Sequence, residues 1–224
     1  MKVGLVTIGQ SPRTDVTPIL KEMLGSDVDL IEKGALDGLT KEEIEKLAPR
    51  MRDYVLVTRL NDGTFVKVSR RHVANKIQKC IKELEEMGVD INLLLCTGEF
   101  PNLKAKKPLL MPDKLISNIV QCIKGGKIGI VVPEEEQIPL TKRKWEGKER
   151  SVVITSANPY GESKAFEEAA NLLAKNDVDL IVLDCIGFTP KVKEFFKRIT
   201  RKPVILPQTI LGSILKELVD ASKH

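Results

Sequence analysis

Aromatic residues, histidines and long apolar runs are all scarce in this 224-residue chain. Aromatic residues make up 4% of it, too few for a platform on which nucleic-acid bases stack. No apolar run approaches the roughly 18 residues that a membrane-spanning helix needs, and the first residues turn polar too soon for a signal peptide. The sequence therefore predicts a cytoplasmic protein that binds neither nucleic acid nor membrane.

The few histidines and cysteines narrow the chemistry further. His72 and His224 are too few for a histidine-based metal site or a Ser-His triad, so no metal is expected. Four cysteines in a cytoplasmic chain are expected to be thiols, because disulfides rarely persist in that compartment. The net charge of +5 arises from interleaved Lys and Glu residues and indicates no particular partner.

Hydrophobic periodicity predicts strands that alternate with helices. Asn61-Asp62-Gly63 predicts a hairpin turn, because Asp-Gly tolerates the positive φ angles of a tight turn. Strands are predicted at residues 2–8, 28–31, 54–59, 64–69 and 91–96, and helices at residues 17–24, 73–87, 114–123, 164–173 and 210–219.

The order of these elements repeats along the chain. Residues 89–98 (VDINLLLCTG) align without a gap with residues 178–187 (VDLIVLDCIG), at an offset of 89. Two shorter matches, at offsets of 125 and 95, pair residues 2–6 with 127–131 and residues 107–112 with 202–207. Three matches in the same order predict an α/β protein of two pseudo-symmetric lobes with mainly parallel sheets.

The offsets also predict how the lobes differ. The offset falls from 125 to 89, which gives the first lobe about 36 extra residues, many of them in the hairpin. We expect an N-terminal lobe at residues 1–110, a crossing helix and hinge at 111–126, and a C-terminal lobe at 127–224. Gly125-Gly126 is either a hinge for lobe closure or the end of the preceding helix.

The repeat divides the cysteines into two kinds. Cys80 and Cys122 fall on apolar faces of predicted helices and are expected to be small core residues. Cys96 and Cys185 are equivalent in the repeat, and each ends a strand and is followed by X-Gly. Because ligands of such sheets bind at the carboxyl ends of the strands, these two thiols can face each other across one cleft. Simple core packing and a thiol–disulfide function remain as alternatives.

Two opposed thiols suit proton transfer at carbon. One thiolate removes a proton from one face of a stereocentre next to a carboxylate, and a thiol on the other face supplies a new proton. Cationic neighbours or helix N-termini must favour the thiolate on one side. The backbone amides that follow each cysteine can bind the carbanion's oxygens, which makes Thr97, Gly98, Ile186 and Gly187 candidate binding residues.

Polar residues follow other strands at the same edge. Ser11 offers a hydroxyl group and Arg13 a guanidinium fork that matches a carboxylate. Ser156 and Asn158 offer hydroxyl and amide groups to substrate oxygens. A surface-loop role for Arg13 and ordinary turn chemistry at Asn158-Pro159 are the alternatives. Asp184 precedes Cys185 in a strand and is expected to point to the opposite face and orient the loop.

Three motifs resemble those of the AroM family, within the aspartate/glutamate and hydantoin racemase-like superfamily. They are TIGQSPRTD at residues 7–15, LNDG at residues 60–63 followed by SRR at 69–71, and LDCIGF at 183–188. The superfamily also includes maleate isomerases and arylmalonate decarboxylases. The resemblance implies two α/β lobes with one cysteine each, catalysis without cofactor or metal, and a homodimer.

The chain departs from the amino-acid racemases of that superfamily. It has Gln10-Ser11 where they place Asp-Ser, and Cys96-Thr97-Gly98 where they place Cys-Asn-Thr. The sequence favours a cofactor-independent racemase or isomerase, or a related C–C lyase. Its substrate is expected to be a small carboxylate- or amide-bearing molecule, with Cys96 and Cys185 as the acid/base or nucleophilic pair. The alternative is a ligand-binding or regulatory protein that has the fold without the chemistry.

Overall fold

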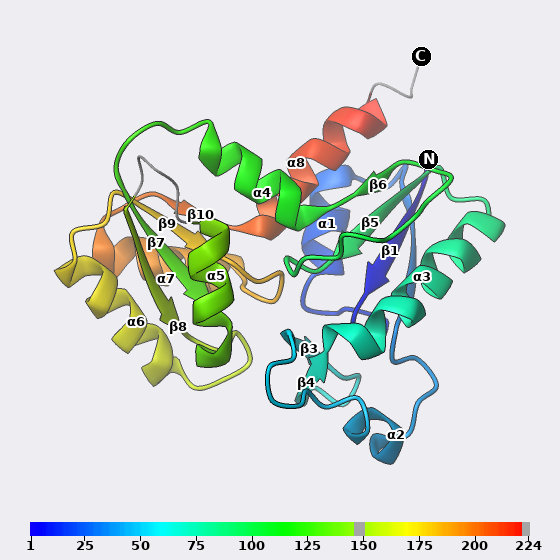
Figure 1. Ribbon diagram of the computed structural model, residues 1–224. Coiled ribbons are helices and arrows are strands. Elements are labelled where there is room, and N and C mark those ends of the chain that lie inside the picture. Colours follow the sequence, from blue (N-terminus) through cyan, green and yellow to red (C-terminus); the bar gives the residue numbers. More distant parts are fainter. Residues whose placement is uncertain (146–150, 221–224) are drawn as a thin grey trace. The chain divides into compact units, whose positions relative to one another are not determined.

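The computed structural model describes residues 1–145 and 151–220, which form two compact units (Figure 1). Unit 1 comprises Met1–Asp113 with Leu211–His224, and unit 2 comprises Lys114–Ile210. The two boundaries fall inside helices α4 (Pro112–Gln121) and α8 (Pro207–Asp220). The described part of α8 from Leu211 to Asp220 groups with unit 1. His224 lies outside the described residues.

Unit 1 contains a four-stranded parallel sheet in the order β2-β1-β5-β6. Its inner strands β1 and β5 are mainly apolar, as expected when both faces of a parallel sheet are covered, and Asn92 is a fully buried polar residue within β5. Every residue of β5 is buried. The strands are β1 (Lys2–Thr7), β2 (Asp29–Gly34), β5 (Ile91–Leu95) and β6 (Leu109–Leu110).

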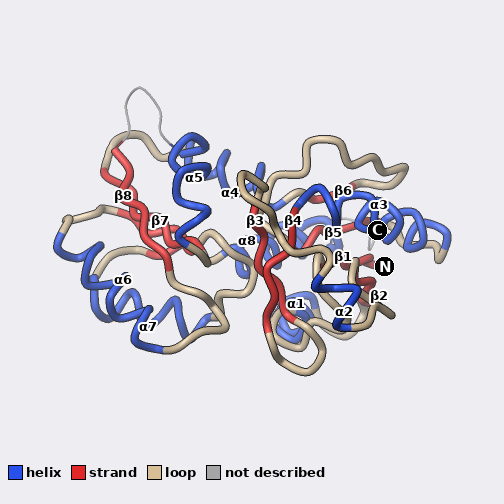
Figure 2. The backbone as a smooth tube through the Cα atoms, turned by 60° about the horizontal axis from the view of Figure 1, so that its bottom comes forward, coloured by secondary structure: helices blue, strands red, loops and turns tan. Residues whose placement is uncertain are grey.

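An antiparallel hairpin distinguishes unit 1 (Figures 1 and 2). It pairs β3 (Val55–Arg59) with β4 (Phe65–Ser69), and its turn is closed by a 2.8 Å hydrogen bond from Leu60 N to Thr64 O. Gly63 has φ 88°, the positive φ angle that the Asp62-Gly63 turn was expected to need. The helices that lie wholly in unit 1 are α1 (Thr17–Leu24), α2 (Lys41–Glu45) and α3 (Arg70–Glu86).

Unit 2 contains a second four-stranded parallel sheet, in the order β10-β9-β7-β8. Helices α6 and α7 contribute to the apolar core on one of its faces, and α4 and α5 to a second core. The elements are β7 (Lys127–Val132), η1 (Glu135–Gln137), α5 (Ile138–Trp145), β8 (Ser151–Ser156), α6 (Ser163–Lys175), β9 (Leu180–Leu183), α7 (Pro190–Thr200) and β10 (Val204–Ile205).

The three repeated segments occupy equivalent positions in the two sheets. β1 corresponds to β7, β5 to β9 and β6 to β10, so the order β2-β1-β5-β6 matches β8-β7-β9-β10. The match extends to the preceding helices, since Leu84 of α3 and Leu173 of α6 are 89 residues apart and both fully buried. The prediction of an α/β fold with two related, mainly parallel lobes is confirmed.

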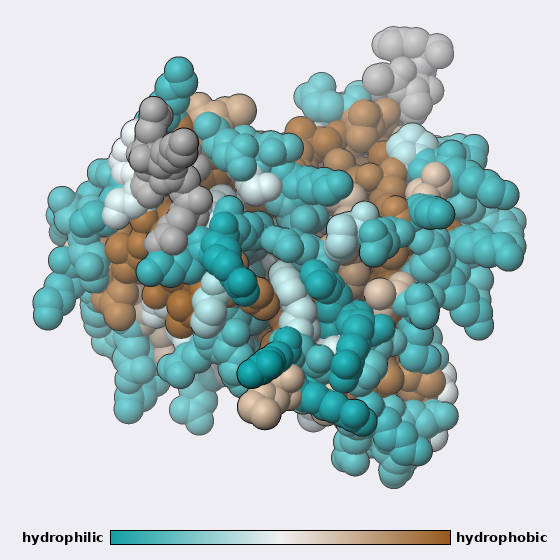
Figure 3. Space-filling model, viewed as in Figure 1, coloured by the Kyte–Doolittle hydropathy of each residue, from teal (hydrophilic) through white to brown (hydrophobic). Residues whose placement is uncertain are grey.

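Helix α3 shows how the sequence sets burial. Val73, Ile77, Cys80, Ile81 and Leu84 form its buried face, as the apolar spacing predicts. Its outer face is hydrophilic in Figure 3. No helix among residues 1–145 and 151–220 is long and apolar enough to cross a membrane.

The prediction for Cys80 is confirmed and that for Cys122 is wrong. Cys80 is 7% exposed within the core of unit 1. Cys122 is exposed, because α4 ends at Gln121 and its fully buried positions stop at Val120. The sequence predicted that this helix continues to residue 123, which would place Cys122 on its apolar face. The helix ends before that residue.

Candidate functional site

Cys96 and Cys185 have the same local surroundings in their respective units. Cys96 directly follows β5, and Cys185 follows β9 after one residue. Both sit at the carboxyl end of a parallel sheet and are 6% and 7% exposed. Each sulfur accepts a hydrogen bond from the backbone N–H two residues later, Gly98 N at 3.3 Å and Gly187 N at 3.4 Å. The repeat therefore extends to a contact at the sulfur atoms.

That contact favours an ionised sulfur. A backbone N–H that donates to sulfur stabilises the thiolate more than the neutral thiol. Cys80 is buried to the same degree but has carboxylates nearby, and burial together with Glu83 and Asp37 raises its pKa to about 11. Cys80 is thus a poor proton acceptor near neutral pH, whereas Cys96 and Cys185 each have an amide donor.

The peptide of Glu99 is held on both sides after the Cys96-Thr97-Gly98 segment. The Tyr54 hydroxyl accepts from Glu99 N at 3.3 Å, and the Arg70 guanidinium donates to Glu99 O at 3.1 Å. The Arg70 guanidinium also lies 4.4 Å from the centre of the Tyr54 ring, a favourable cation–π geometry. A Cβ atom at Gly98 would lie 2.6 Å from a Leu56 methyl group, so the hairpin packs closely on this loop.

The guanidinium group of Arg13 binds the carboxylate of Asp15. Its side chain is 2% exposed, and Nε and Nη2 each donate to an oxygen of Asp15 at 2.8 Å. Nη1 donates to the Thr7 hydroxyl at 2.9 Å. Burial raises the pKa of Asp15, but the hydrogen bonds and charge of Arg13 outweigh it and leave that pKa lowered. The fork that the sequence assigned to a substrate carboxylate is thus bound to Asp15.

Ser11 lies where two of the sequence motifs meet. Its hydroxyl donates to Asp37 Oδ2 at 2.6 Å, and its carbonyl accepts from the Asn61 amide at 3.0 Å. Asn61 N in turn donates to Gln10 Oε1 at 2.9 Å. The segment after β1 and the tip of the hairpin therefore form one surface of unit 1.

In unit 2, α8 and the loop after β8 support the Cys185 loop. Gln208 is fully buried, and its Nε2 donates to Ile186 O at 2.7 Å. Tyr160 packs so closely on Gly187 that a Cβ atom there would collide with the tyrosine hydroxyl. The loop that carries Cys185 thus depends on residues from two other segments.

Asp184 contacts α5 through its side chain. Its Oδ2 accepts from Trp145 Nε1 at 3.0 Å and from Lys144 Nζ at 3.3 Å. Lys144 is 12% exposed, so this ion pair is largely buried. Cys185, by contrast, belongs to the core that contains α6 and α7.

The remaining candidates of unit 2 lie just after β8. Ser156 is the last residue of that strand and is half-buried. The Asn158 amide donates to Glu134 Oε1 at 2.6 Å, and its Oδ1 accepts from Tyr160 N at 2.9 Å. Asn158 therefore shapes the loop that places Tyr160 against the Cys185 loop.

Sequence reasoning missed Tyr54 and Gln208 as supports of the two loops. One signal was present, since the chain has only two tyrosines and each packs near the glycine of a Cys-X-Gly segment. Gln208 follows Pro207, the last residue of the third repeated segment. No three His, Cys, Asp or Glu residues in the described ranges come together as metal ligands do.

Sequence comparison identifies the family. A model of the family described as "AroM protein" matches residues 3–219. Comparison with curated proteins gives no match.

Comparison with solved structures identifies the fold. Allantoin racemase from Klebsiella pneumoniae is 14% identical with a TM-score of 0.62, over 99% of this chain and 88% of that one. Picrophilus torridus aspartate racemase is 17% identical with a TM-score of 0.63, over 98% and 94%. The maleate isomerase Iso from Pseudomonas putida S16 is 15% identical with a TM-score of 0.61, over 98% and 93%. The chain therefore has the racemase-like fold over nearly its whole length.

Proposed function

The chain belongs to the AroM family, and we propose that it is a cofactor-independent enzyme of the racemase or isomerase type. In this proposal Cys96 and Cys185 are the acid and base that act on one carbon atom, next to a carboxylate or amide carbonyl. The observation that supports it best is the matched N–H contact at each sulfur, from Gly98 at 3.3 Å and from Gly187 at 3.4 Å.

The proposed step moves one proton off the carbon atom and another onto it. One thiolate takes the proton and becomes a thiol, and the electrons of the C–H bond delocalise onto the neighbouring carbonyl oxygen. The other thiol then donates its proton to the opposite face and becomes the thiolate. No oxidant or reductant is needed, because the substrate gains and loses only protons.

Other residues bind and position the substrate in this proposal. The segments Cys96-Thr97-Gly98 and Cys185-Ile186-Gly187 present backbone amides toward the oxygen on which charge develops. Ser11, Ser156 and Asn158 supply polar groups at the same strand ends. Arg13 acts as a positioning residue, because it ties the segment that carries Ser11 to Thr7 of β1 and to Glu32 of β2.

The names of the similar structures supply the first substrates to test: allantoin, aspartate and maleate. The decisive measurement is deuterium incorporation from D₂O at the α-carbon of each enantiomer of allantoin and aspartate, followed by proton NMR. Conversion of maleate is followed in parallel. Cys96→Ser and Cys185→Ser are each expected to lower inversion by about 10²- to 10⁴-fold.

The two variants differ in what they retain. Each variant keeps one thiol, which can remove a proton from only one enantiomer of the substrate. The two variants are therefore expected to catalyse deuterium exchange with opposite enantiomers. Cys122→Ser, which alters an exposed cysteine, is the matched control and keeps full activity. If both variants keep the wild-type rate of inversion, the acid/base assignment is wrong.

The alternative is a protein that binds such molecules without converting them. It predicts a calorimetric binding signal with no exchange, and unchanged affinity in both serine variants. The family resemblance also supports a cytoplasmic location and a homodimer. Sedimentation equilibrium tests the dimer, whose expected mass is twice the chain mass of 25.0 kDa.

A further inference from the structure

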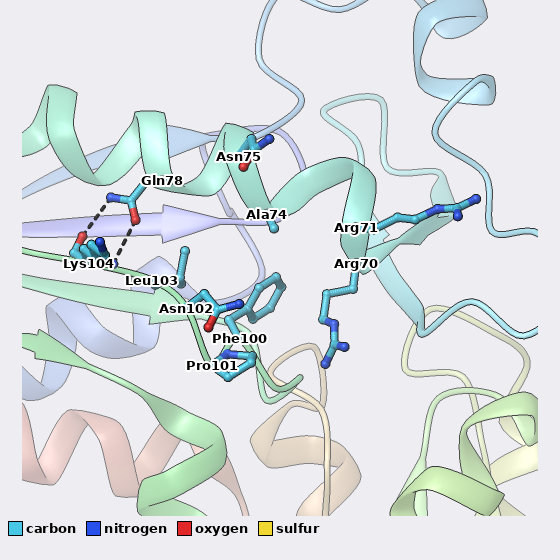
Figure 4. A pocket seen from close by; sticks show the side chains of 10 residues that line it. All are labelled: Arg70, Arg71, Ala74, Asn75, Gln78, Phe100, Pro101, Asn102, Leu103 and Lys104. Atoms are coloured by element: carbon cyan, nitrogen blue, oxygen red, sulfur yellow. Dashed lines mark hydrogen bonds between the residues drawn. The ribbon is translucent and has the colours of Figure 1, made fainter.

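Unit 1 contains a cavity of about 580 Å³ between α3 and the loop that follows the Cys96 segment (Figure 4). None of the site residues predicted from the sequence lines it. Its lining comes from the first half of the helix and from the loop: Arg70, Arg71, Ala74, Asn75, Gln78, Phe100, Pro101, Asn102, Leu103 and Lys104.

The lining combines an apolar wall with positive charge. Ala74, Phe100 and Leu103 supply apolar surface, and Phe100 is only 4% exposed. Three of the ten residues are cationic and none is acidic. A cavity of this size with apolar walls and a few polar groups is typical of small-molecule sites. Its charge favours an organic anion with an apolar body.

The cations differ in how far they are already paired. Arg71 lies 3.3 Å from the Asp53 carboxylate, and its side chain points away from Phe100 in Figure 4. Lys104 forms no ion pair with any residue that the structure describes. Arg70 points toward the side of the cavity where Phe100 and Pro101 lie. Lys104 is therefore the cation that a carboxylate reaches directly, and Arg70 is reached by displacing its hydrogen bond to Glu99 O.

The loop is fastened to α3 at one side of the cavity. Gln78 Nε2 donates to Lys104 O at 2.7 Å, and Lys104 N donates to Gln78 Oε1 at 2.8 Å. Beyond this pair, Glu85 Oε1 accepts from Lys106 N at 2.7 Å and from Lys107 N at 2.9 Å. These bonds fix the wall that carries Lys104 before any ligand arrives.

At the other side, Arg70 connects the cavity to the Cys96 segment. Its guanidinium donates to Glu99 O at 3.1 Å, and Glu99 directly follows Gly98, whose N–H bonds the Cys96 sulfur. A carboxylate bound to the guanidinium forms a stronger hydrogen bond than a carbonyl does, so it competes for Arg70. Loss of that bond loosens the segment that holds the amide at the sulfur.

We propose that this cavity is an effector site for a small organic anion with an apolar body, and that binding there changes the reactivity of Cys96. The proposal does not depend on catalysis, because both ligand binding and thiol reactivity are measured without turnover.

Binding is tested on the full chain by calorimetry with benzoate as the probe and benzamide as its neutral counterpart. Benzoate is expected to bind and benzamide to bind at least about threefold more weakly. Lys104→Gln is expected to weaken benzoate binding by about threefold. Lys107→Gln is the matched control, since Lys107 is on the same loop and does not line the cavity. Equal binding of benzoate and benzamide, or equal affinity of the two variants, overturns the proposal.

Coupling is tested by the rate at which iodoacetamide alkylates Cys96, read by mass spectrometry with Cys185 as the internal reference. Saturating benzoate is expected to change the Cys96 rate at least threefold in the wild type and less in Ala74→Leu, which narrows the cavity beside Phe100 and Leu103. An unchanged wild-type rate overturns the coupling. The same change in Ala74→Leu overturns the site, because it places benzoate elsewhere.

Discussion

The loop after Cys96 is held by the hairpin and by α3, whereas the loop after Cys185 is held by α8 and the segment after β8. Tyr54 and Arg70 bind the peptide of Glu99 in unit 1. In unit 2, Gln208 binds the carbonyl of Ile186, and Tyr160 packs on Gly187. The hydrogen bond from glycine N–H to sulfur is common to both loops, and so is a tyrosine near that glycine. The two copies thus share the contact at the sulfur atom and differ in the hydrogen bonds that hold the loop around it.

This difference places unlike groups near two like thiols. The support in unit 1 includes the permanent charge of Arg70, whereas Gln208 in unit 2 is neutral. A two-base mechanism requires one thiolate and one thiol at the same time, so unequal surroundings fit its needs. The predictions below test whether the two loops respond separately.

The largest effect is expected from a methyl group at the glycine of each loop. Gly187→Ala should lower the free energy of unfolding by about 1–3 kcal/mol, because the new Cβ meets the hydroxyl at the end of the rigid Tyr160 ring. Gly98→Ala should cost less, because a methyl group at the end of the Leu56 side chain can move aside. Urea denaturation measures both values.

A double variant checks the cause. Tyr160→Phe removes the hydroxyl that the new methyl group meets first, so Gly187→Ala should cost less in a Tyr160→Phe background. An equal cost in both backgrounds, or a larger cost for Gly98→Ala, would show that the loops are not supported as described.

A smaller effect is expected when the supporting hydrogen bonds are removed one at a time. Arg70→Gln should change the alkylation rate of Cys96 by about threefold or more and leave that of Cys185 unaltered, because it removes the donor to Glu99 O. Gln208→Ala should do the reverse, because it leaves the Ile186 carbonyl without that donor. Mass spectrometry of the two cysteine peptides reports both rates in one sample.

The control for this pair is the double variant. If the loops are independent, its two rates equal those of the corresponding single variants. If either single variant alters both cysteines equally, the supports act on the whole protein and not on one loop.

The smallest effect concerns the thiol outside the pair. Since the pKa of Cys80 is raised from 9.0 to about 11, the unfolded chain releases this proton at a lower pH than the folded chain does. Its contribution to stability is therefore fully present below pH 9 and is lost as the pH rises through about 11. Urea denaturation across this range should show a shallower decline in Cys80→Ala than in the wild type, and parallel declines would contradict the assignment.

Much of the fold was predictable because the inner strands are apolar runs and because the chain repeats itself. The repeat, however, predicts in one half of the chain only those elements that the other half also contains. Helix α7 was missed for that reason, since the corresponding residues of unit 1 form the loop between β5 and β6. Helix α2 was missed because it has five residues and buries only Ile44, which leaves no period to detect; its Thr40–Glu43 capping box was the available signal.

The two cysteines were predictable from register alone, but their supports were not. Tyr54 lies 45 residues from Glu99 in sequence, and Gln208 lies 22 residues from Ile186. Such contacts depend on how separate elements pack, which periodicity does not encode. Arg13 illustrates the same limit, since its residue type suits a substrate carboxylate equally well as the carboxylate of Asp15, two residues away.

The division of α8 between the units has a consequence for biosynthesis. Gly212 packs against Met23 near the end of α1, and Lys216 Nζ donates to Met23 O at 3.4 Å. Unit 2 is contiguous in sequence and has all its residues once the chain is made as far as Ile210. Most of unit 1 is synthesised before unit 2, but the residues that cover the end of α1 are synthesised after Ile210. Unit 1 can therefore complete its folding only after unit 2 has been synthesised.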